Sequence, residues 1–292
     1  MDVVIIFNGL GNQMSQYAFY LQHKKKKIST YFIPFCSDHN GLELESVFGV
    51  NCKVSFSQRV LYILFRILLT DKVKWLSGPI QKLLHLLNCN IVKENFDYNF
   101  NSDYLKPSRG ITFYYGGWHT EKYFVGAKDI VDDIFEFNTP NDEKNCSFIT
   151  SIKSTNSVSL HVRRGDFFNN DNINLFGGVC TTAYFQKAIS TMESKVANPH
   201  FFVFSNDLAW VKENIFIKNV TYVDCNAGKN SWKDMYLMSL CQHNIIANST
   251  FSWWGAWLNK NKNKIVISPK RFLNSDSTTD VYPDAWIKLG DY

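Results

Sequence analysis

Val158-Ser159-Leu160-His161-Val162-Arg163-Arg164-Gly165-Asp166 is the stretch that decides the fold, because an apolar run typical of a buried strand ends directly in cationic side chains. Arginine guanidiniums are planar, hold their charge at physiological pH and meet phosphate oxygens two at a time. In open α/β sheets, ligands bind where the carboxyl ends of the strands meet the loops. The stretch therefore predicts a strand of a parallel sheet whose carboxyl end binds a diphosphate.

The residues around this stretch alternate between short apolar segments and helix-like segments. Such alternation is typical of a parallel sheet with helices on both faces. We expect strands at 158–162, 201–204, 220–223, 244–247 and 265–268, and helices at 182–195, 207–214, 231–243 and 252–259.

The N-terminal half also begins as a β-α-β unit. An apolar run at 3–7 meets a glycine turn, apolar residues then recur at helical spacing, and a second strand is expected at 29–35. Residues 50–101 are amphipathic with a helical period and predict a helical insertion, whereas the polar stretch 138–156 is the best linker candidate. We therefore expect an α/β protein of two domains, residues 1–150 and 151–292.

Composition, charge and cysteine usage limit the class of protein. A formal charge of +5 over 292 residues gives little support to a nucleic-acid-binding role for the entire molecule, but it is compatible with a local phosphate site or an anionic membrane surface. The seven cysteines are widely spread and form no paired metal-ligand motif, so we interpret them as reduced thiols of a cytoplasmic protein. We expect no secretory leader, because the run at 3–7 is too short for one and lacks a basic start, and the apolar run at 60–69 is too short to cross a bilayer.

The lysines at 24–27 have two interpretations. They are either the solvated end of the first helix or a peripheral contact with anionic lipid head groups on the cytoplasmic face of the inner membrane.

A second candidate site follows the predicted strand at 244–247. Asn248, Ser249, Thr250 and Phe251 lie where a helix begins, so that hydroxyls and free backbone N–H groups gather at a helix N-terminus, which favours anions. An ordinary N-cap beside two buried tryptophans is the alternative. Because Arg163 belongs to the same predicted sheet, we expect these residues to form the second half of a diphosphate clamp.

Ser205, Asn206 and Asp207 follow a third predicted strand. The Asp207 carboxylate can accept two hydrogen bonds from the N1–H and amino groups of guanine, which adenine does not offer, although Ser205 or Asp207 can equally be a plain helix N-cap. Within the opening stretch we assign Arg163 to the phosphates, His161 to a base or phosphate, and Asp166 to orienting the arginines. The alternative is a surface arginine pair whose salt bridge with an aspartate caps the sheet. Strand alternation turns Arg164 away from Arg163, so we expect Arg164 to support the fold or to hold Asp166.

Two stretches of the N-terminal half complete the candidate residues. The turn that starts at Gly9 lacks the third glycine of a dinucleotide fingerprint, so it is weak evidence for a phosphate site, with Gly11 and Gln13 as candidate donor contacts and Asn12 facing a cleft between the substrates. At 116–121, an aromatic ring, an imidazole and a carboxylate gather in a turn, as in a sugar-binding acceptor site, whereas an exposed loop or a core tryptophan is the alternative; the residues are Trp118, His119 and Glu121.

Together these motifs resemble the bacterial α1,2-fucosyltransferase family. The stretch 9–14 is similar to its N-terminal signature, 161–166 to its central His-x-Arg-Arg-x-Asp motif, 204–210 to the next, and 234–254 to its C-terminal block. The resemblance implies a GT-B architecture with two Rossmann-like domains facing across a cleft, the C-terminal one holding GDP-β-L-fucose and the N-terminal one presenting the acceptor. It also implies inverting transfer, without metal or cofactor, to the 2-hydroxyl of a terminal galactoside in a lipid-linked surface polysaccharide or O-antigen unit.

The resemblance also implies residue roles. Arg163 contacts the β-phosphate, His161 and Asp207 the guanine, and Ser249, Thr250 and Phe251 the diphosphate, while Asn12 lies at the reaction centre. Position 206 is Asn where many relatives carry Asp. No Asp-x-Asp pair lies beside the predicted phosphate site, so arginine has to supply the cation there.

The reaction that fits is a one-step displacement, in which Arg163 and the helix start at 249–250 stabilise the departing diphosphate. Asp166, His119 and Glu121 are candidate general bases, unless a leaving group this good needs none. A different fucosyl linkage, a non-catalytic carbohydrate-binding protein and a nucleic-acid-binding protein are the alternatives. The last has scattered basic groups and no RNA-binding signature.

Overall fold

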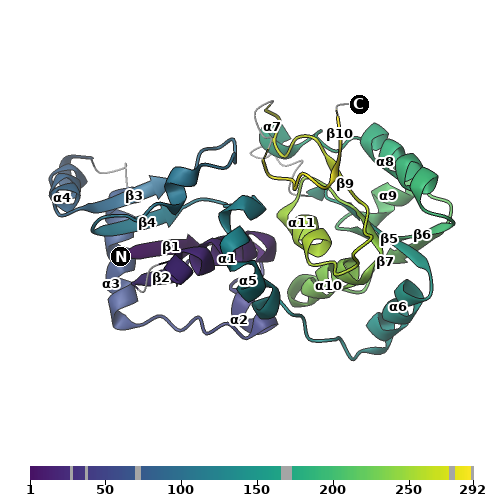
Figure 1. Ribbon diagram of the computed structural model, residues 1–292, viewed down its shortest axis with the longest axis horizontal. Coiled ribbons are helices and arrows are strands. Elements are labelled where there is room, and N and C mark those ends of the chain that lie inside the picture. Colours follow the sequence, from purple (N-terminus) through teal and green to yellow (C-terminus); the bar gives the residue numbers. More distant parts are fainter. Residues whose placement is uncertain (27–28, 37–38, 70–73, 166–172, 276–279, 291–292) are drawn as a thin grey trace. The chain divides into compact units, whose positions relative to one another are not determined.

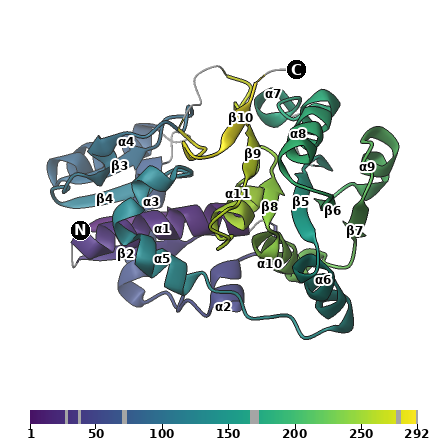
Figure 2. The ribbon, with the colours of Figure 1, turned by 45° about the vertical axis from the view of Figure 1, so that its right-hand side comes forward.

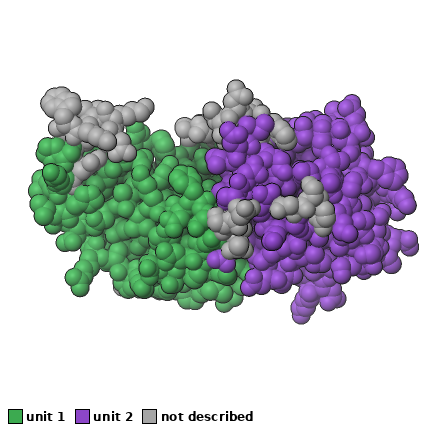
Figure 3. Space-filling view, turned by 90° about the horizontal axis from the view of Figure 1, so that it is seen from above, with its two compact units in different colours: residues 1–136 green, residues 137–292 purple. Residues whose placement is uncertain are grey.

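The computed structural model describes residues 1–26, 29–36, 39–69, 74–165, 173–275 and 280–290. The chain forms two compact units, Met1–Glu136 and Phe137–Tyr292, which Figure 3 colours separately. Each unit contains a parallel sheet with helices, which confirms the predicted α/β class. Within the described part of the chain, no helix has the length and apolar character that crossing a bilayer requires.

Unit 1 is built on a four-stranded parallel sheet of order β2-β1-β4-β3 (Figure 1). Its strands are β1 (Asp2–Ile6), β2 (Thr30–Pro34), β3 (Cys89–Lys93) and β4 (Ile111–Tyr115). Its α-helices are α1 (Leu10–Lys26), α2 (Glu43–Phe48), α3 (Phe56–Leu69), α4 (Lys74–Leu86) and α5 (Lys128–Ile134). Short 3₁₀ turns lie at Ser102–Leu105, Glu121–Tyr123 and Val125–Ala127.

The two faces of this sheet are covered by different helices, because successive strand residues point to opposite sides. Val3 and Ile5 of β1 pack in one layer with side chains of α3 and α4. On the other face, Phe19 of α1 packs edge-on against Tyr114, with 5.4 Å between the ring centroids. Unit 1 is therefore a three-layer α/β/α structure.

The predicted helical insertion is confirmed by α3 and α4, but its expected extent to residue 101 is wrong. Residues Cys89–Lys93 form β3, an edge strand paired in parallel with Ile111–Tyr115. Five residues are too few to show a clear strand period. The pairing partner lies about twenty residues further along the chain, so it leaves no local signal.

Unit 2 is built on a six-stranded sheet of order β10-β9-β8-β5-β6-β7, in which every pairing is parallel. Its strands are β5 (Asn156–Val162), β6 (Pro199–Ser205), β7 (Val220–Val223), β8 (His243–Ile245), β9 (Val266–Pro269) and β10 (Ile287–Leu289). Its helices are α6 (Glu143–Lys153), α7 (Ile173–Phe176), α8 (Thr182–Lys195), α9 (Leu208–Asn214), α10 (Trp232–Leu240) and α11 (Thr250–Trp257).

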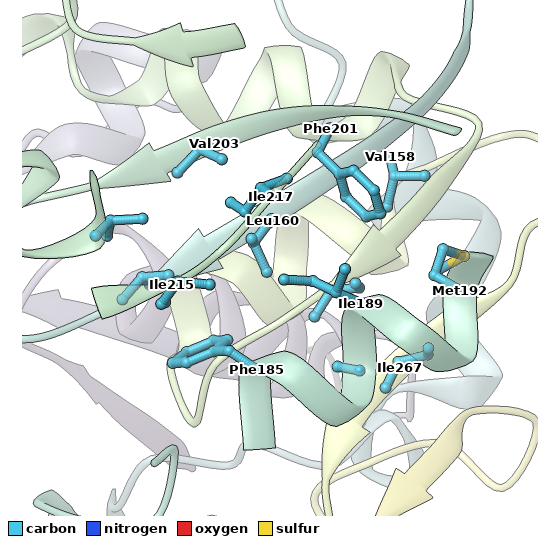
Figure 4. Close-up of a cluster of buried hydrophobic side chains, with 14 of the residues drawn as sticks. Val158, Leu160, Phe185, Ile189, Met192, Phe201, Val203, Ile215, Ile217 and Ile267 are labelled. Atoms are coloured by element: carbon cyan, nitrogen blue, oxygen red, sulfur yellow. The ribbon is translucent and has the colours of Figure 1, made fainter. Parts of the chain in front are cut away.

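The core of unit 2 has one layer on each face of the sheet. Val158, Leu160 and Phe201 pack with α8 in the layer that Figure 4 shows. Phe202 and Phe204 point to the opposite layer, which α6 and α10 cover (Figure 2). Burial of each such side chain contributes roughly 1.5–3 kcal/mol. The strands that carry the candidate site are therefore held rigidly from both sides.

The polar stretch 138–156, expected to be a linker, contains α6 instead. Asp142 caps this helix, since its carboxylate accepts a hydrogen bond from the Asn145 backbone N–H at 3.1 Å. Ile149 and Ile152 are buried beside Phe202. One face of α6 is apolar and the rest is polar, so its average composition resembles a linker. The boundary expected at residue 150 falls inside this helix, and the units divide after residue 136.

Candidate functional site

Three neighbouring strands of unit 2 end at one edge of the sheet in the residues that the sequence singled out. Strand β5 lies between β8 and β6, with Val162 opposite Ser205 and Leu160 opposite Ile245. Parallel strands share the direction of their carboxyl ends. The segments that follow these strands, at 163–165, 206–207 and 246–250, therefore begin at the same edge.

Arg164 holds this edge together. Its guanidinium lies 3.8 Å from the ring centroid of Trp210, and its Nε is 3.4 Å from Oδ2 of Asp207. A guanidinium stacked on an indole gains cation–π energy in addition to the ion pair. Arg164 thus supports the fold, as strand alternation predicted.

Asp207 has two structural partners. Its Oδ1 accepts a hydrogen bond from the Trp210 backbone N–H at 3.1 Å and caps α9, while its Oδ2 faces Arg164. The Ser205 hydroxyl oxygen accepts a hydrogen bond from the Asp207 N–H at 3.0 Å. The N-cap interpretation is confirmed for Asp207. Because 39% of its side chain is exposed, its guanine contact stays a prediction.

Asn206 fixes the turn after β5. Its Oδ1 accepts a hydrogen bond from the Arg164 backbone N–H at 3.0 Å. Gly165 has φ +29°, a conformation that residues with a Cβ rarely adopt, and a Cβ there would also displace the amide of Asn206. Asn206 thus fixes the backbone of the segment that carries Arg163 and Arg164. Asp166, which we expected to orient the arginines, lies outside the described residues.

His161 is a buried, neutral imidazole at the end of β5. Burial first, and then the positive charge of Arg163, lowers its pKa from 6.5 to about 3. Its ring centroid is 5.8 Å from that of Phe251, and its Nδ1 has no hydrogen-bond partner among the described residues. A buried polar atom without a partner costs free energy unless a ligand or water satisfies it. The contact of His161 with a ligand beside Arg163 stays a prediction.

The segment between β8 and α11 divides its polar side chains between two roles. The Asn248 amide donates hydrogen bonds to the carbonyl oxygens of Phe176 and Phe272, each at 3.1 Å, so this side chain connects its own segment to the end of α7 and to the segment after β9. Ser249 adopts an extended backbone before α11, and its side chain does not cap the helix. The hydroxyls of Ser249 and Thr250 form no hydrogen bond within the part of the chain described here. They are available to an anion at the helix start.

One cationic residue of the same edge was missed. Strand β9 neighbours β8 and is followed by Arg271, which is partly buried. The strand at 265–268 was predicted, so the rule that polar residues after strands form sites would have found it. The described residues contain no cluster of three or more His, Cys, Asp or Glu side chains placed to hold a metal ion.

The glycine turn of unit 1 is already occupied by a side chain. Oε2 of Glu43 accepts a hydrogen bond from the Leu10 backbone N–H at 3.1 Å, at the position where a phosphate binds in a phosphate-binding helix turn. Asn40 donates to the other carboxylate oxygen at 3.1 Å. Burial raises the pKa of Glu43. The turn around Gly11 is thus closed by the protein itself.

Gln13 corrects our expectation of a donor contact. Its Nε2 donates to the carbonyl oxygens of Asn8 and Gly41, and its Oε1 accepts from the N–H groups of Glu43 and Leu44. An amide side chain has two donors and two acceptor positions, and all four are used. Gln13 therefore holds the turn. Asn12, one residue earlier, is partly exposed, and its role at the reaction centre stays a prediction.

Trp118 is a core residue, which corrects its assignment as a sugar-stacking group. Its side chain is fully buried, and its ring stacks on Phe19 with centroids 4.1 Å apart and planes inclined by 6°. Tyr123 contacts it edge-on at 5.5 Å. Its backbone has φ +55°, a conformation that packing of the ring maintains. The alternative of a core tryptophan is confirmed.

The other two acceptor-side candidates differ in environment. His119 is buried, which lowers its pKa to about 3 and makes it a weak base, and its ring lies 4.8 Å from that of Tyr98. A Cβ at Gly117 would lie 2.3 Å from its Nε2, so the glycine makes room for the imidazole. Glu121 is partly exposed at the start of a 3₁₀ turn. The acceptor roles of both remain predictions.

Sequence reasoning missed Glu94, which organises the same loop. Its Oε2 accepts hydrogen bonds from the backbone N–H groups of Gly117 at 2.7 Å and Trp118 at 2.8 Å. Its Oε1 is buried and has no hydrogen-bond partner among the residues described. Burial raises the pKa of this carboxyl group from 4.5 to about 7. Glu94 directly follows β3, so the failure to predict that strand hid it.

We expect Glu94→Gln to change how stability depends on pH. Because the folded pKa lies above the unfolded one, the stability that the protonated group contributes is complete below about pH 4.5 and is lost as the pH rises through about 7. The free energy of unfolding of wild type relative to the variant should therefore fall by about 3 kcal/mol over this range. Urea unfolding at several pH values measures it. Since both proteins share His119, its opposite pH effect cancels, and parallel curves would contradict the assignment.

Comparison with known proteins places this chain in a family. A model described as Glycosyl transferase family 11 matches residues 2–290. The chain belongs to this family. The O-antigen biosynthesis glycosyltransferase WbnK of Escherichia coli is 32% identical over 96% of this chain and 98% of its own length. An alpha-1,2-colitosyltransferase of Escherichia coli is 30% identical over 99% of both chains.

A more local similarity concerns a human protein. The galactoside alpha-(1,2)-fucosyltransferase 1 of Homo sapiens is 35% identical over 103 residues, which are 35% of this chain and 28% of that protein. Membership of glycosyl transferase family 11 confirms the family resemblance drawn from the motifs. It also identifies the chain as a glycosyltransferase.

Proposed function

We propose that this family 11 glycosyltransferase transfers L-fucose from GDP-β-L-fucose to the 2-hydroxyl of a terminal galactoside, with inversion to an α1,2 linkage. The observation that carries the proposal is the carboxyl edge of β8-β5-β6. There Arg163 is combined with the neutral His161 and with two hydroxyls that have no partner among the described residues, those of Ser249 and Thr250. This combination suits a nucleotide diphosphate.

The proposed chemistry is a single displacement. The acceptor oxygen forms a bond to C1 of the sugar while the bond from C1 to the phosphate oxygen breaks, and GDP departs with the electron pair. The acceptor proton passes to a base or to solvent. Negative charge grows on the diphosphate, so Arg163 and the N-terminus of α11 stabilise the transition state more than the ground state. This assigns the cationic role to arginine and requires no metal or cofactor.

Two further residues fit the nucleotide. His161 is neutral at pH 7 and can donate or accept one hydrogen bond, and Asp207 is partly exposed beside Arg164. We propose that both contact the guanine, with Phe251 beside His161 at the diphosphate. Because the Asp207 carboxylate already pairs with Arg164, it has to bind the guanine and the Arg164 guanidinium at the same time.

The names of the relatives support the proposed acceptor, but they leave two candidate donors. WbnK is named for O-antigen biosynthesis, which supports a lipid-linked surface oligosaccharide as acceptor. The cysteines form no disulfide within the described residues, as expected if the reaction occurs in the cytoplasm. A colitosyltransferase matches over the same length with nearly the same identity, so GDP-colitose is the second candidate donor. Colitose differs from L-fucose by lacking the 3-hydroxyl.

A donor and acceptor panel tests the proposal. We expect GDP release from GDP-fucose to rise at least tenfold when a β-galactoside is added, and NMR of the product to show an α1,2 linkage. Faster turnover of GDP-colitose would reassign the donor, and another linkage would reassign the acceptor hydroxyl. Galactoside binding without GDP release from either donor would identify a non-catalytic carbohydrate-binding protein and overturn the proposal.

A further inference from the structure

The net positive charge of the protein is concentrated in one segment of unit 1. Residues 50–92 contain six Lys or Arg and one Asp, which gives +5, equal to the formal charge of the entire chain. The remaining residues therefore sum to zero. This segment contains α3 and α4. A charge so localised attracts anionic partners to one place on the molecule.

Helix α3 has an apolar stripe on both of its sides. Its inner stripe, which includes Leu61 and Phe65, packs on the sheet. Its outer stripe consists of Phe56, Val60 and Ile63, whose exposed fractions are 83%, 41% and 58%. Spacings of four and three residues place these three side chains on one face of a helix. The outer stripe therefore contributes nothing to the core of unit 1.

Helix α4 and the residue after it repeat this arrangement. Leu83, Leu86 and Leu87 are exposed to 56%, 80% and 66%, whereas Leu84 packs in the same core layer as the inner side of α3. One side of each helix thus packs in the same core layer on the unit 1 sheet, and the exposed apolar residues lie on the other side. We call these six exposed apolar residues the α3–α4 face. Clusters of exposed apolar side chains of this kind mark interaction sites.

Cations border the α3–α4 face directly. Arg59 is exposed next to Val60, and Lys82 is exposed next to Leu83. Arg66 lies 5.8 Å from the ring of Phe35 and 5.9 Å from that of Tyr62, so its stem lies along apolar surface. Long apolar side chains with Lys and Arg beside them are typical of helices that lie in the interface of a membrane.

We propose that the α3–α4 face binds the surface of a bilayer that contains anionic lipids. The six apolar side chains enter the headgroup region, and the neighbouring lysines and arginines bind the anionic head groups. A second copy of this chain fits less well, because a two-fold interface through this face would bring two segments of +5 together. Nucleic acid would not use the exposed leucines. The proposal is independent of which sugar the enzyme transfers.

The lysines at the end of α1 are a weaker candidate for the same contact. Nζ of Lys25 donates to the carbonyl oxygen of Gly126 at 2.5 Å, and Nζ of Lys24 lies 5.5 Å from the ring of Tyr20. Both side chains therefore already contact groups within unit 1. A variant with both lysines changed to Gln therefore serves as the comparison for charge.

Vesicle co-sedimentation of the full chain tests the proposal. We expect binding to vesicles of phosphatidylcholine with phosphatidylglycerol, and at least tenfold weaker binding to phosphatidylcholine alone. Arg59→Gln combined with Lys82→Gln should weaken binding about twenty-five-fold, since each charge near an anionic surface contributes roughly fivefold. Ile63→Ser combined with Leu86→Ser should weaken it at least tenfold. Thermal unfolding and GDP binding should not change, because all four side chains are exposed.

Two controls make the result decisive. Phe216→Ser removes an apolar side chain of unit 2 that is 71% exposed and should leave vesicle binding unchanged, as should the Lys24 and Lys25 double variant. Equal binding to both vesicles, or equal loss in the control variants, would overturn the proposal. So would the absence of vesicle binding together with a dimer that the Ile63 and Leu86 substitutions dissociate, which would identify the face as an interface between copies.

Discussion

Arg163→Lys should fold normally and transfer sugar at least a hundredfold more slowly than wild type. Lysine preserves the charge at the end of β5 but loses the planar fork that binds two phosphate oxygens at once. Removal of one preorganised donor from a charge that grows in the transition state costs about 3 kcal/mol. The effect should fall on kcat, because the arginine acts most strongly on the departing diphosphate. GDP release under saturating donor and acceptor measures it, with circular dichroism and thermal unfolding as tests of folding.

The neighbouring arginine provides a matched control. Arg164→Lys makes the same chemical change one residue away, where the guanidinium stacks on Trp210 and pairs with Asp207. We expect a loss of stability of about 1–2 kcal/mol and less than a tenfold loss in kcat. If Arg163→Lys turns over at a near-normal rate, Arg163 has no part in the chemistry. If the two variants behave alike, the pair acts as one structural unit.

Trp118→Ala should destabilise the protein by about 3–5 kcal/mol, the range observed when a large buried aromatic side chain is removed. The ring is fully buried between Phe19, Tyr104 and Tyr123, so its loss leaves a cavity within unit 1. The KM for the galactoside should change little in the protein that remains folded. Urea unfolding gives the stability, and initial rates at several acceptor concentrations give the KM.

A smaller substitution separates packing from sugar binding. Trp118→Phe retains an aromatic ring against Phe19 and should cost clearly less than the alanine variant. Unchanged stability in Trp118→Ala together with a large rise in the acceptor KM would restore the sugar-stacking role that the sequence suggested. The positive φ of Trp118 does not affect this comparison, because Ala and Phe both carry a Cβ.

Sequence reasoning succeeded where one local pattern determines one element. The run from Val158 to Val162 is apolar on the face that points to α8, and the arginines after it can only begin at the carboxyl edge. Glycine and helical spacing likewise predicted the β-α-β start of unit 1. In each case, the residues that form the element also carry the signal for it.

It failed where the decisive partner is distant in the sequence. Strand β3 depends on its pairing with β4, and Glu94 became visible only once that strand was in place. Trp118 resembles a loop aromatic until Phe19, almost a hundred residues away, covers its face. Gln13 resembles a ligand contact until the backbone around Glu43 saturates its amide. Such roles are set by tertiary contacts, which a residue's own neighbours do not encode.

The carboxylate of Glu43 at the start of α1 distinguishes the two halves of the chain. Each half contains a parallel strand followed by a loop and a helix start, β1 before α1 in unit 1 and β8 before α11 in unit 2. A phosphate group is attracted to any such start that is open. In unit 1 the Glu43 carboxylate accepts the hydrogen bond from the Leu10 N–H. In unit 2 the hydroxyls of Ser249 and Thr250 leave the start of α11 open. Of these two helix starts, we therefore expect only that of α11 to bind the diphosphate of a nucleotide.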